Sequence, residues 1–101
     1  MVVEFSIVPV GKGEELAGLV AKVIDIIDRS GLAYQLTSMG TLVEGDWDEV
    51  FALIKACHRK MRREAGRVLT HIAVDDRARA KGRLKGKVED VEKTLGRRLK
   101  T

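Results

Sequence analysis

Four polar side chains stand where they could bind a small molecule. Ser6 interrupts an apolar run near the N-terminus, Thr37 and Thr41 flank a turn that contains glycine, and Glu44 follows three residues later. A buried hydroxyl in an apolar strand needs a hydrogen-bond partner. If neighbouring strands bring these side chains to one half-open face, the hydroxyls and the acid would line a ligand-binding site. Ordinary strand hydroxyls, with Glu44 as an acid that precedes a helix, are the alternative interpretation.

The residues that could act as a nucleophile and its base are poorly placed for that role. Cys57 and His58 are neighbours in a helical segment, and successive side chains on a helix point about 100° apart. Cys57 also lies on an apolar stripe, so we expect a packed core thiol. We expect His58 to be a surface residue of the helix and His71 a strand or interface residue. The sequence therefore predicts no catalytic residue, and we expect that the protein is not an enzyme.

Metal and phosphate ligands are equally sparse. The chain has one cysteine and two histidines, too few for a zinc site within one chain. Asp75, Asp76 and Arg77 could seat a divalent cation, although two acids beside an arginine also suit a local ion pair or a turn. Gly11 and Gly13 lack the longer glycine spacing of a phosphate-binding loop. We expect no metal and no cofactor.

The elements that position these residues follow from hydrophobic periodicity and turn residues. Alternation predicts strands, and apolar residues spaced by three and four predict helices. Glu14 and Glu15 would favour the dipole of the first helix, and Asp46 or Asp48 would cap the second. In order, the predicted elements are a strand over 2–10, a helix over 13–29, strands over 33–39 and 41–45, a helix from 46 or 48 to about 66, a strand over 67–75, a basic loop over 77–86 and a helix over 87–99.

This order predicts an α+β fold of the ferredoxin-like, split βαβ type (β-α-β-β-α-β), with an extra C-terminal helix. At 101 residues the chain is expected to form a single domain, residues 1–101. Two helices cover only one face of such a sheet, and the opposite face carries apolar residues that include Val2 and Val8. We therefore expect self-association, as a homodimer or a dimer of dimers, through the open sheet face.

Charge is distributed unevenly along the chain. Residues 1–54 carry three basic and nine acidic side chains, whereas residues 55–101 carry sixteen basic and six acidic ones. The basic half could bind nucleic acid, but aromatic residues make up 4% of the chain, few for a base-stacking surface. The two halves could instead complement each other between subunits. No apolar run is long enough to span a bilayer, and we expect a cytoplasmic protein without a membrane partner.

Several segments spread over nearly the whole chain resemble one family. They are residues 5–11 (Phe-Ser-Ile-Val-Pro-Val-Gly), 34–36 (Tyr-Gln-Leu), 39–45 (Met-Gly-Thr-Leu-Val-Glu-Gly), 48–50 (Asp-Glu-Val), 75–77 (Asp-Asp-Arg) and 86–91 (Gly-Lys-Val-Glu-Asp-Val). Together they resemble the small YkoF-like thiamine-binding family, and residues 39–45 are the most specific part of the match.

The resemblance implies a ferredoxin-like fold, assembly as dimers of dimers, and non-covalent binding of thiamine or its hydroxymethylpyrimidine half. It implies a carrier, sensor or salvage component without chemistry of its own. By position, Ser6 and Thr41 match the hydroxyl residues that such relatives use on the pyrimidine, and Glu44 would offset the cationic thiazolium. A nucleic-acid-binding module that uses the basic half, or a structural or regulatory oligomer, is the alternative function.

Overall fold

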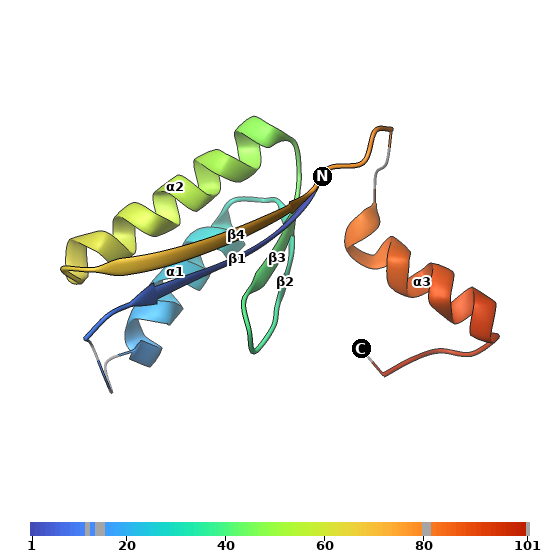
Figure 1. Ribbon diagram of the computed structural model, residues 1–101, viewed down its shortest axis with the longest axis horizontal. Coiled ribbons are helices and arrows are strands. Elements are labelled where there is room, and N and C mark those ends of the chain that lie inside the picture. The colour runs from blue at the N-terminus through green and yellow to red at the C-terminus, as the bar shows by residue number, and fades with distance from the viewer. Residues whose placement is uncertain (12, 14–15, 80–81, 101) are drawn as a thin grey trace.

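The computed structural model describes residues 1–11, 13, 16–79 and 82–100, and in them four strands and three helices (Figure 1). Their order along the chain and the strand order β2-β3-β1-β4, antiparallel throughout, are those of the ferredoxin-like plan. The predicted α+β fold class, including the extra C-terminal helix, is confirmed. The elements are β1 (Val2–Pro9), α1 (Leu16–Arg29), β2 (Ala33–Leu36), β3 (Thr41–Glu44), α2 (Trp47–Glu64), β4 (Val68–Asp75) and α3 (Arg83–Leu95).

The core lies between the sheet and the helices α1 and α2. Val3 and Phe5 of β1 are buried with Val43 of β3, while Glu4 between them is exposed, as the alternation of a half-covered strand requires. The register pairs Phe5 with Thr41 and Val3 with Val43, so these residues face the helices together. The buried helical residues of this core are Leu19, Val23, Ile27, Val50, Leu53, Ile54, Cys57 and Met61.

Two expected boundaries at helix starts can be compared with the structure. α2 begins after Asp46, whose carboxylate accepts a 2.9 Å hydrogen bond from the backbone N–H of Glu49. This bond lowers the pKa of Asp46 below its usual range, so Asp46, and not Asp48, is the N-cap. α1 begins at Leu16. Glu14 and Glu15, expected in its first turn, lie outside the described residues.

The second strand and the last helix differ from their predicted ranges. β2 ends at Leu36 and not at residue 39, because the Thr37 side chain bonds the backbone of the following turn. α3 spans Arg83–Leu95, four residues earlier than predicted. It ends at Gly96, whose φ of 74° is left-handed and whose N–H donates to the Glu92 carbonyl. The glycine at 86 therefore lies within the helix, and not at its start.

α3 stands apart from the α1 and α2 layer, at the right-hand end of the view in Figure 1. It packs against the hairpin strands β2 and β3 and buries none of its residues. Much of the other sheet face, which carries Val8 and Leu69 side by side across the β1–β4 register, is open. Among the described helices, none has the length and apolar character needed to cross a membrane.

Candidate ligand-binding site

A cavity of about 210 Å³ lies where the tip of the β2–β3 hairpin meets the free part of β1. β3 pairs with β1 only as far as Phe5, opposite Thr41, whereas β1 continues to Pro9 beside β4. The end of β1 therefore has a strand neighbour on one side only. The described residues that line the cavity carry no charged side chain; they are Phe5, Ser6, Ile7, Val8, Leu16, Val20, Val23, Ile24, Leu36, Thr37, Ser38, Met39, Gly40, Thr41 and Met61.

The backbone of Ile7 turns its polar groups toward this cavity. Met1 and Gly45 exchange backbone hydrogen bonds on the β3 side, whereas Val10 donates to Arg67 on the β4 side. Backbone groups alternate between the two edges of a strand, so the odd-numbered residues of β1 face β3 and the even-numbered ones face β4. Ile7 lies two residues beyond Phe5, the last residue of β1 that pairs with β3. Its N–H and C=O thus point to the side where the cavity lies.

Thr41 supplies the most buried polar side chain of the cavity. Its exposed fraction is 5%, and its hydroxyl forms no hydrogen bond within the part of the chain that the structure describes. Buried hydroxyls are nearly always bonded, and no fully enclosed side-chain nitrogen or oxygen among the described residues lacks a hydrogen-bond partner. The Thr41 hydroxyl therefore retains access to the cavity and is free to bond a molecule there.

Thr37 has a different position although it lines the same cavity. Its hydroxyl donates to the Gly40 carbonyl at 2.7 Å and accepts from the N–H groups of Met39 and Gly40 at 3.2 and 3.1 Å. These three bonds hold the hairpin turn. A Cβ on Gly40 would lie 2.9 Å from the carbonyl oxygen of Phe5, so glycine allows the turn to approach β1. Thr37 thus shapes the cavity and has little capacity left for a ligand.

Ser6 and Glu44 do not share a face with Thr41. Ser6 lies at the cavity but alternates with Phe5, so its side chain belongs to the open face of the sheet. Glu44 lies three residues beyond Thr41, and its carboxylate accepts a 2.7 Å bond from the backbone N–H of Arg83 at the start of α3. The structure thus brings Ser6, Thr37 and Thr41 to one cavity and places Glu44 elsewhere. The expectation that all four side chains share one face is wrong, because Thr41 pairs with Phe5. Paired residues point to the same face of a sheet, so Thr41 faces the helices with Phe5, whereas Ser6 points to the opposite face.

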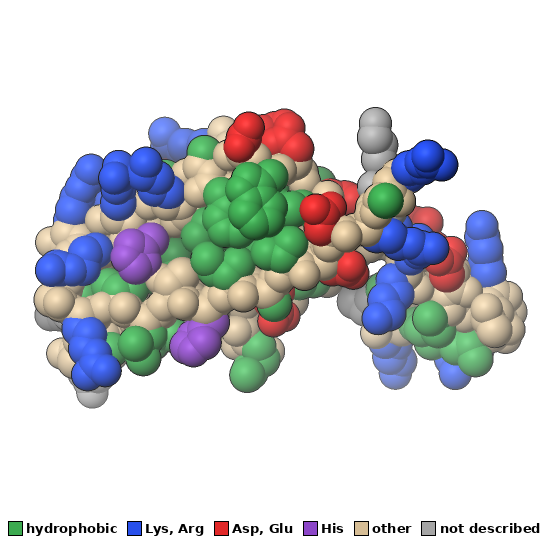
Figure 2. All heavy atoms as spheres, turned by 45° about the horizontal axis from the view of Figure 1, so that its top comes forward, with side chains coloured by type: hydrophobic (Ala, Val, Ile, Leu, Met, Phe, Trp, Pro, Cys, Tyr) green, Lys and Arg blue, Asp and Glu red, His purple; other side chains and the backbone are tan. Residues whose placement is uncertain are grey.

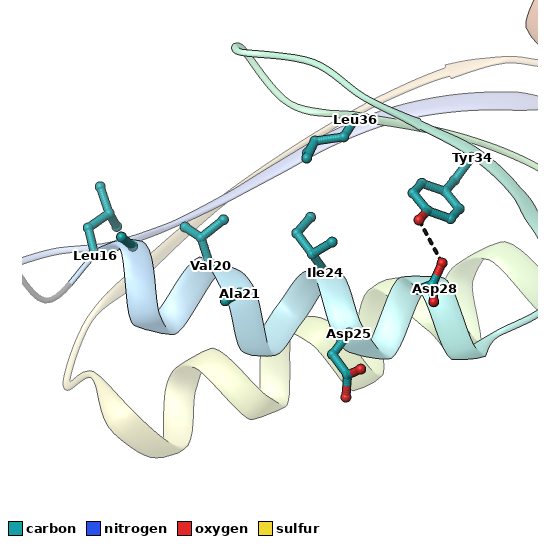
Figure 3. A pocket seen from close by; sticks show the side chains of 9 residues that line it. Leu16, Val20, Ala21, Ile24, Asp25, Asp28, Tyr34 and Leu36 are labelled. Carbon is teal, nitrogen blue, oxygen red and sulfur yellow. Dashed lines mark hydrogen bonds between the residues drawn. The ribbon is translucent and has the colours of Figure 1, made fainter.

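A second hollow is an open groove between α1 and β2 (Figure 3), next to this cavity. Tyr34 at its far end donates a 2.7 Å hydrogen bond to Asp28, and this bond raises the pKa of the Tyr34 phenol above its usual value. Helix periodicity predicted the apolar stripe of α1 but gave no signal for the pairing of Tyr34 with Asp28, which depends on the sheet register. The groove and the cavity share Leu16, Val20, Ile24 and Leu36.

The residues considered for catalysis and metal binding lie apart from the cavity. Cys57 is buried in the core, which confirms the packed thiol, and burial raises its pKa to about 11. His58 is half-buried rather than on the surface, and its Nδ1 lies 2.6 Å from the Thr70 hydroxyl. His71 is exposed on β4. Within residues 1–11, 13, 16–79 and 82–100, no cluster of three metal-binding side chains occurs.

Figure 2 shows hydrophobic side chains gathered in the middle of one face, with basic side chains at both ends of the molecule. Trp47 at the start of α2 stacks on Phe51, with ring centroids 4.4 Å apart, and is 57% exposed. Ile72 and Val74 of the edge strand β4 are also exposed. On this face, hydrophobic and acidic side chains separate the two basic groups.

The sequence profile of the family described as "Thiamine-binding protein" matches residues 3–92. UPF0045 protein MJ1052 of Methanocaldococcus jannaschii is 32% identical over 100 residues, which cover 99% of this chain and 89% of the relative. UPF0045 protein YqgV of Bacillus subtilis is 35% identical, with 93% and 96% covered.

Solved structures agree with these relationships. The crystal structure of MJ1052 superposes with a TM-score of 0.76 at 30% identity and covers 94% of both chains. A Thermotoga maritima protein, provisionally named as a thiamine biosynthesis/salvage protein, superposes with a TM-score of 0.79 at 23% identity and covers 89% of this chain and 96% of that one. The latter shows the shared fold. With a profile match over most of its length and relatives of similar size, the chain belongs to the thiamine-binding protein family.

Proposed function

We propose that the protein binds the pyrimidine half of thiamine, or free hydroxymethylpyrimidine, non-covalently in the cavity at the hairpin tip. The observation that carries this proposal is the Thr41 hydroxyl. The residue is only 5% exposed, and its hydroxyl has no hydrogen-bond partner among the described residues. Family membership supplies the class of ligand. A hydroxyl in this state gains a hydrogen bond when a polar ligand enters, and it loses no bond to protein groups in doing so.

The shape of the aminopyrimidine suits the backbone groups beside Thr41. Its edge carries an amine that donates next to a ring nitrogen that accepts, and a strand presents the complementary C=O and N–H. Ile7 offers both groups at the free edge of β1, in the way that an exposed strand edge binds an added strand. The apolar lining and the absence of charged side chains among the described lining residues suit a flat, neutral ring.

We propose a binding role without catalysis. The described residues around the cavity include no histidine, acid or lysine that could act as a base toward Thr41 or Ser6. Cys57, with its raised pKa, lies in the core as a thiol and not as a thiolate. A carrier, sensor or salvage component fits this set of residues.

Calorimetric titration with hydroxymethylpyrimidine and with thiamine tests the proposal. We expect saturable heat with one ligand per chain for both compounds, and a higher melting temperature of the protein when either is present. Cytosine, another aminopyrimidine, serves as a control because it lacks the hydroxymethyl and methyl substituents. Absence of heat and of a thermal shift with both ligands would remove this function and leave the fold alone.

We also propose that the chain self-associates through the open sheet face. Val8 and Leu69 are neighbours in the β1–β4 register on that face and are 44% and 43% exposed. A contiguous exposed apolar patch on a sheet marks an interaction surface. Light scattering with size-exclusion chromatography should give a dimer or tetramer at micromolar concentration. A monomer at that concentration would contradict this part of the proposal.

Nucleic-acid binding by the basic half is less well supported. Arg59, Lys60, Arg62 and Arg63 lie near the end of α2, whereas the basic residues of α3 lie at the other end of the molecule. A phosphate backbone is bound best by a continuous basic surface. On the face shown in Figure 2, hydrophobic and acidic side chains lie between the two groups of basic side chains. Fluorescently labelled RNA that bound with a steep salt dependence would favour this alternative.

A further inference from the structure

The groove between α1 and β2 continues the cavity toward the carboxylate of Asp28, and Asp25 also lines it. Leu16, Val20 and Ile24 stand in a row along α1 and face Leu36 of β2 (Figure 3). These four side chains line both hollows. A ligand held at Thr41 can therefore extend directly from the cavity into the groove. The groove is open to solvent and spans about 910 Å³, more than the cavity, so it has room for the remainder of a two-ring molecule.

At the far end of the groove, the carboxylate of Asp28 forms no ion pair with any described residue. Asp28 accepts a hydrogen bond from the neutral phenol of Tyr34, which leaves its charge in place. Asp25, one turn earlier, points away from β2 in Figure 3 and pairs with Arg29 at 3.1 Å. Neither lysine nor arginine occurs among the described residues that line the groove.

The spacing along β2 places Tyr34 and the Asp28 carboxylate that it bonds about the width of one aromatic ring from Thr41. Leu36 pairs with Thr41 in the register, and Tyr34 is two residues earlier on the same face. Two residues of a strand span about 7 Å. In thiamine a single methylene joins the pyrimidine to the thiazolium, so a pyrimidine at Thr41 would bring the cationic ring toward Tyr34. The aromatic face of Tyr34 and the carboxylate of Asp28 both attract a cation.

We propose that Asp28, held by Tyr34, makes the site selective for a positively charged, unphosphorylated ligand. This inference rests on the proposed function and adds to it the reason for preferring thiamine over its phosphate esters. Asp28 attracts the thiazolium ring. A phosphate on the hydroxyethyl arm of that ring would bring one or more negative charges into a groove whose described lining offers the carboxylates of Asp25 and Asp28 and no basic group. The resulting repulsion weakens binding.

The experiment compares three ligands by calorimetry: hydroxymethylpyrimidine, thiamine and thiamine diphosphate. The wild-type protein should bind thiamine at least about tenfold more tightly than thiamine diphosphate at low salt. Asp28→Asn should weaken thiamine binding about fivefold, leave hydroxymethylpyrimidine binding unchanged, and narrow the difference between thiamine and its diphosphate. Asp76→Asn is the matched control, because Asp76 is exposed beyond the end of β4 and its removal alters net charge equally.

The outcomes separate this inference from the function beneath it. If hydroxymethylpyrimidine binds but Asp28→Asn and Asp76→Asn change thiamine binding equally, or not at all, the role of Asp28 is wrong and the pyrimidine site stands. Thiamine diphosphate that binds the wild-type protein as tightly as thiamine would also overturn the inference. If none of the three ligands binds, both the inference and the proposed function fail. Circular dichroism of each variant confirms that it is folded.

Discussion

The two ends of β3 lie three residues apart and meet different surroundings. Thr41, at the end next to the turn, is buried beside a cavity and its hydroxyl has no partner among the described residues. Glu44, at the other end, is half-buried and its carboxylate holds the first N–H of α3. Thr41 can therefore accept a new partner at little cost, whereas Glu44 would have to release α3 to bind a ligand.

The same contrast separates the two threonines of the hairpin. The hydroxyl of Thr37 makes three hydrogen bonds to the turn, while that of Thr41 makes none to the described protein groups. Residue type alone does not distinguish a hydroxyl that builds a site from one that binds the ligand. The difference lies in which hydrogen bonds are already made, and each of the following changes tests one part of it.

Gly40→Ala should have the largest effect. A Cβ at this position would lie 2.9 Å from the Phe5 carbonyl oxygen, so the turn must move away from β1. We expect the free energy of unfolding to fall by about 2 kcal/mol and ligand binding to weaken as the cavity changes shape. Urea denaturation measures the first effect. Gly66→Ala is the control, since a Cβ there meets nothing within 4 Å, and equal losses in both variants would contradict the role of Gly40.

Thr41→Val should weaken binding with little change in stability. Valine keeps the size of threonine but lacks the hydroxyl, which bonds no described protein group. Loss of one ligand hydrogen bond should lower the affinity for hydroxymethylpyrimidine about tenfold, as measured by calorimetry, while the melting temperature stays the same or rises slightly. Thr41→Ser should retain most of the affinity. Unchanged binding by Thr41→Val would remove the observation on which the proposed function rests.

Thr37→Val should mainly reduce stability. The substitution removes the donor to the Gly40 carbonyl and the acceptor of two turn N–H groups. Because the turn is accessible to water, which replaces part of these bonds, we expect a loss of about 1 kcal/mol in the free energy of unfolding. Thr37→Ser should restore it. A variant of unchanged stability that failed to bind ligand would instead indicate direct contact between Thr37 and the ligand.

Glu44→Ala should have the smallest effect on the protein as a whole and none on ligand binding. It removes the acceptor of the Arg83 N–H, and a half-buried bond of this kind at a helix start contributes about 0.5 kcal/mol. Hydrogen exchange should become faster in α3 and stay unchanged in β1 and β3. If Glu44→Ala weakened the binding of thiamine but not of hydroxymethylpyrimidine, Glu44 would offset the thiazolium charge, as the sequence led us to expect, and Asp28 would not.

Element order and core could be predicted from the sequence because apolar periodicity distinguishes helices from strands and marks their buried faces. The sheet plan followed from the order of these elements. Val8 was expected on the open face of the sheet and lies there, and the apolar stripe that includes Cys57 predicted the core of α2. The predicted end of β2 and the predicted start of α3 were wrong, because these two boundaries depend on individual hydrogen bonds. The Thr37 side chain ends β2 early, and the Glu44 carboxylate meets the start of α3 across 39 positions of sequence, which periodicity does not encode.

The candidate site could be predicted only in part for the same reason. Ser6, Thr37 and Thr41 were expected near one another and do line one cavity. The contribution of the Ile7 backbone follows from β3 being shorter than β1, and the pairing of Asp28 with Tyr34 follows from how α1 lies over β2. Both depend on strand register and helix placement. Residue types do not show which backbone N–H and C=O groups remain unpaired, because nearly all residues carry the same two groups.

A crystal structure of the protein with bound hydroxymethylpyrimidine tests the central claim most directly. The account predicts the ring in the cavity at the hairpin tip, with a polar atom within about 3 Å of the Thr41 hydroxyl and its amine and ring nitrogen facing the C=O and N–H of Ile7. A ring bound beside Glu44 and α3, or on the open face of the sheet away from Thr41, would contradict it.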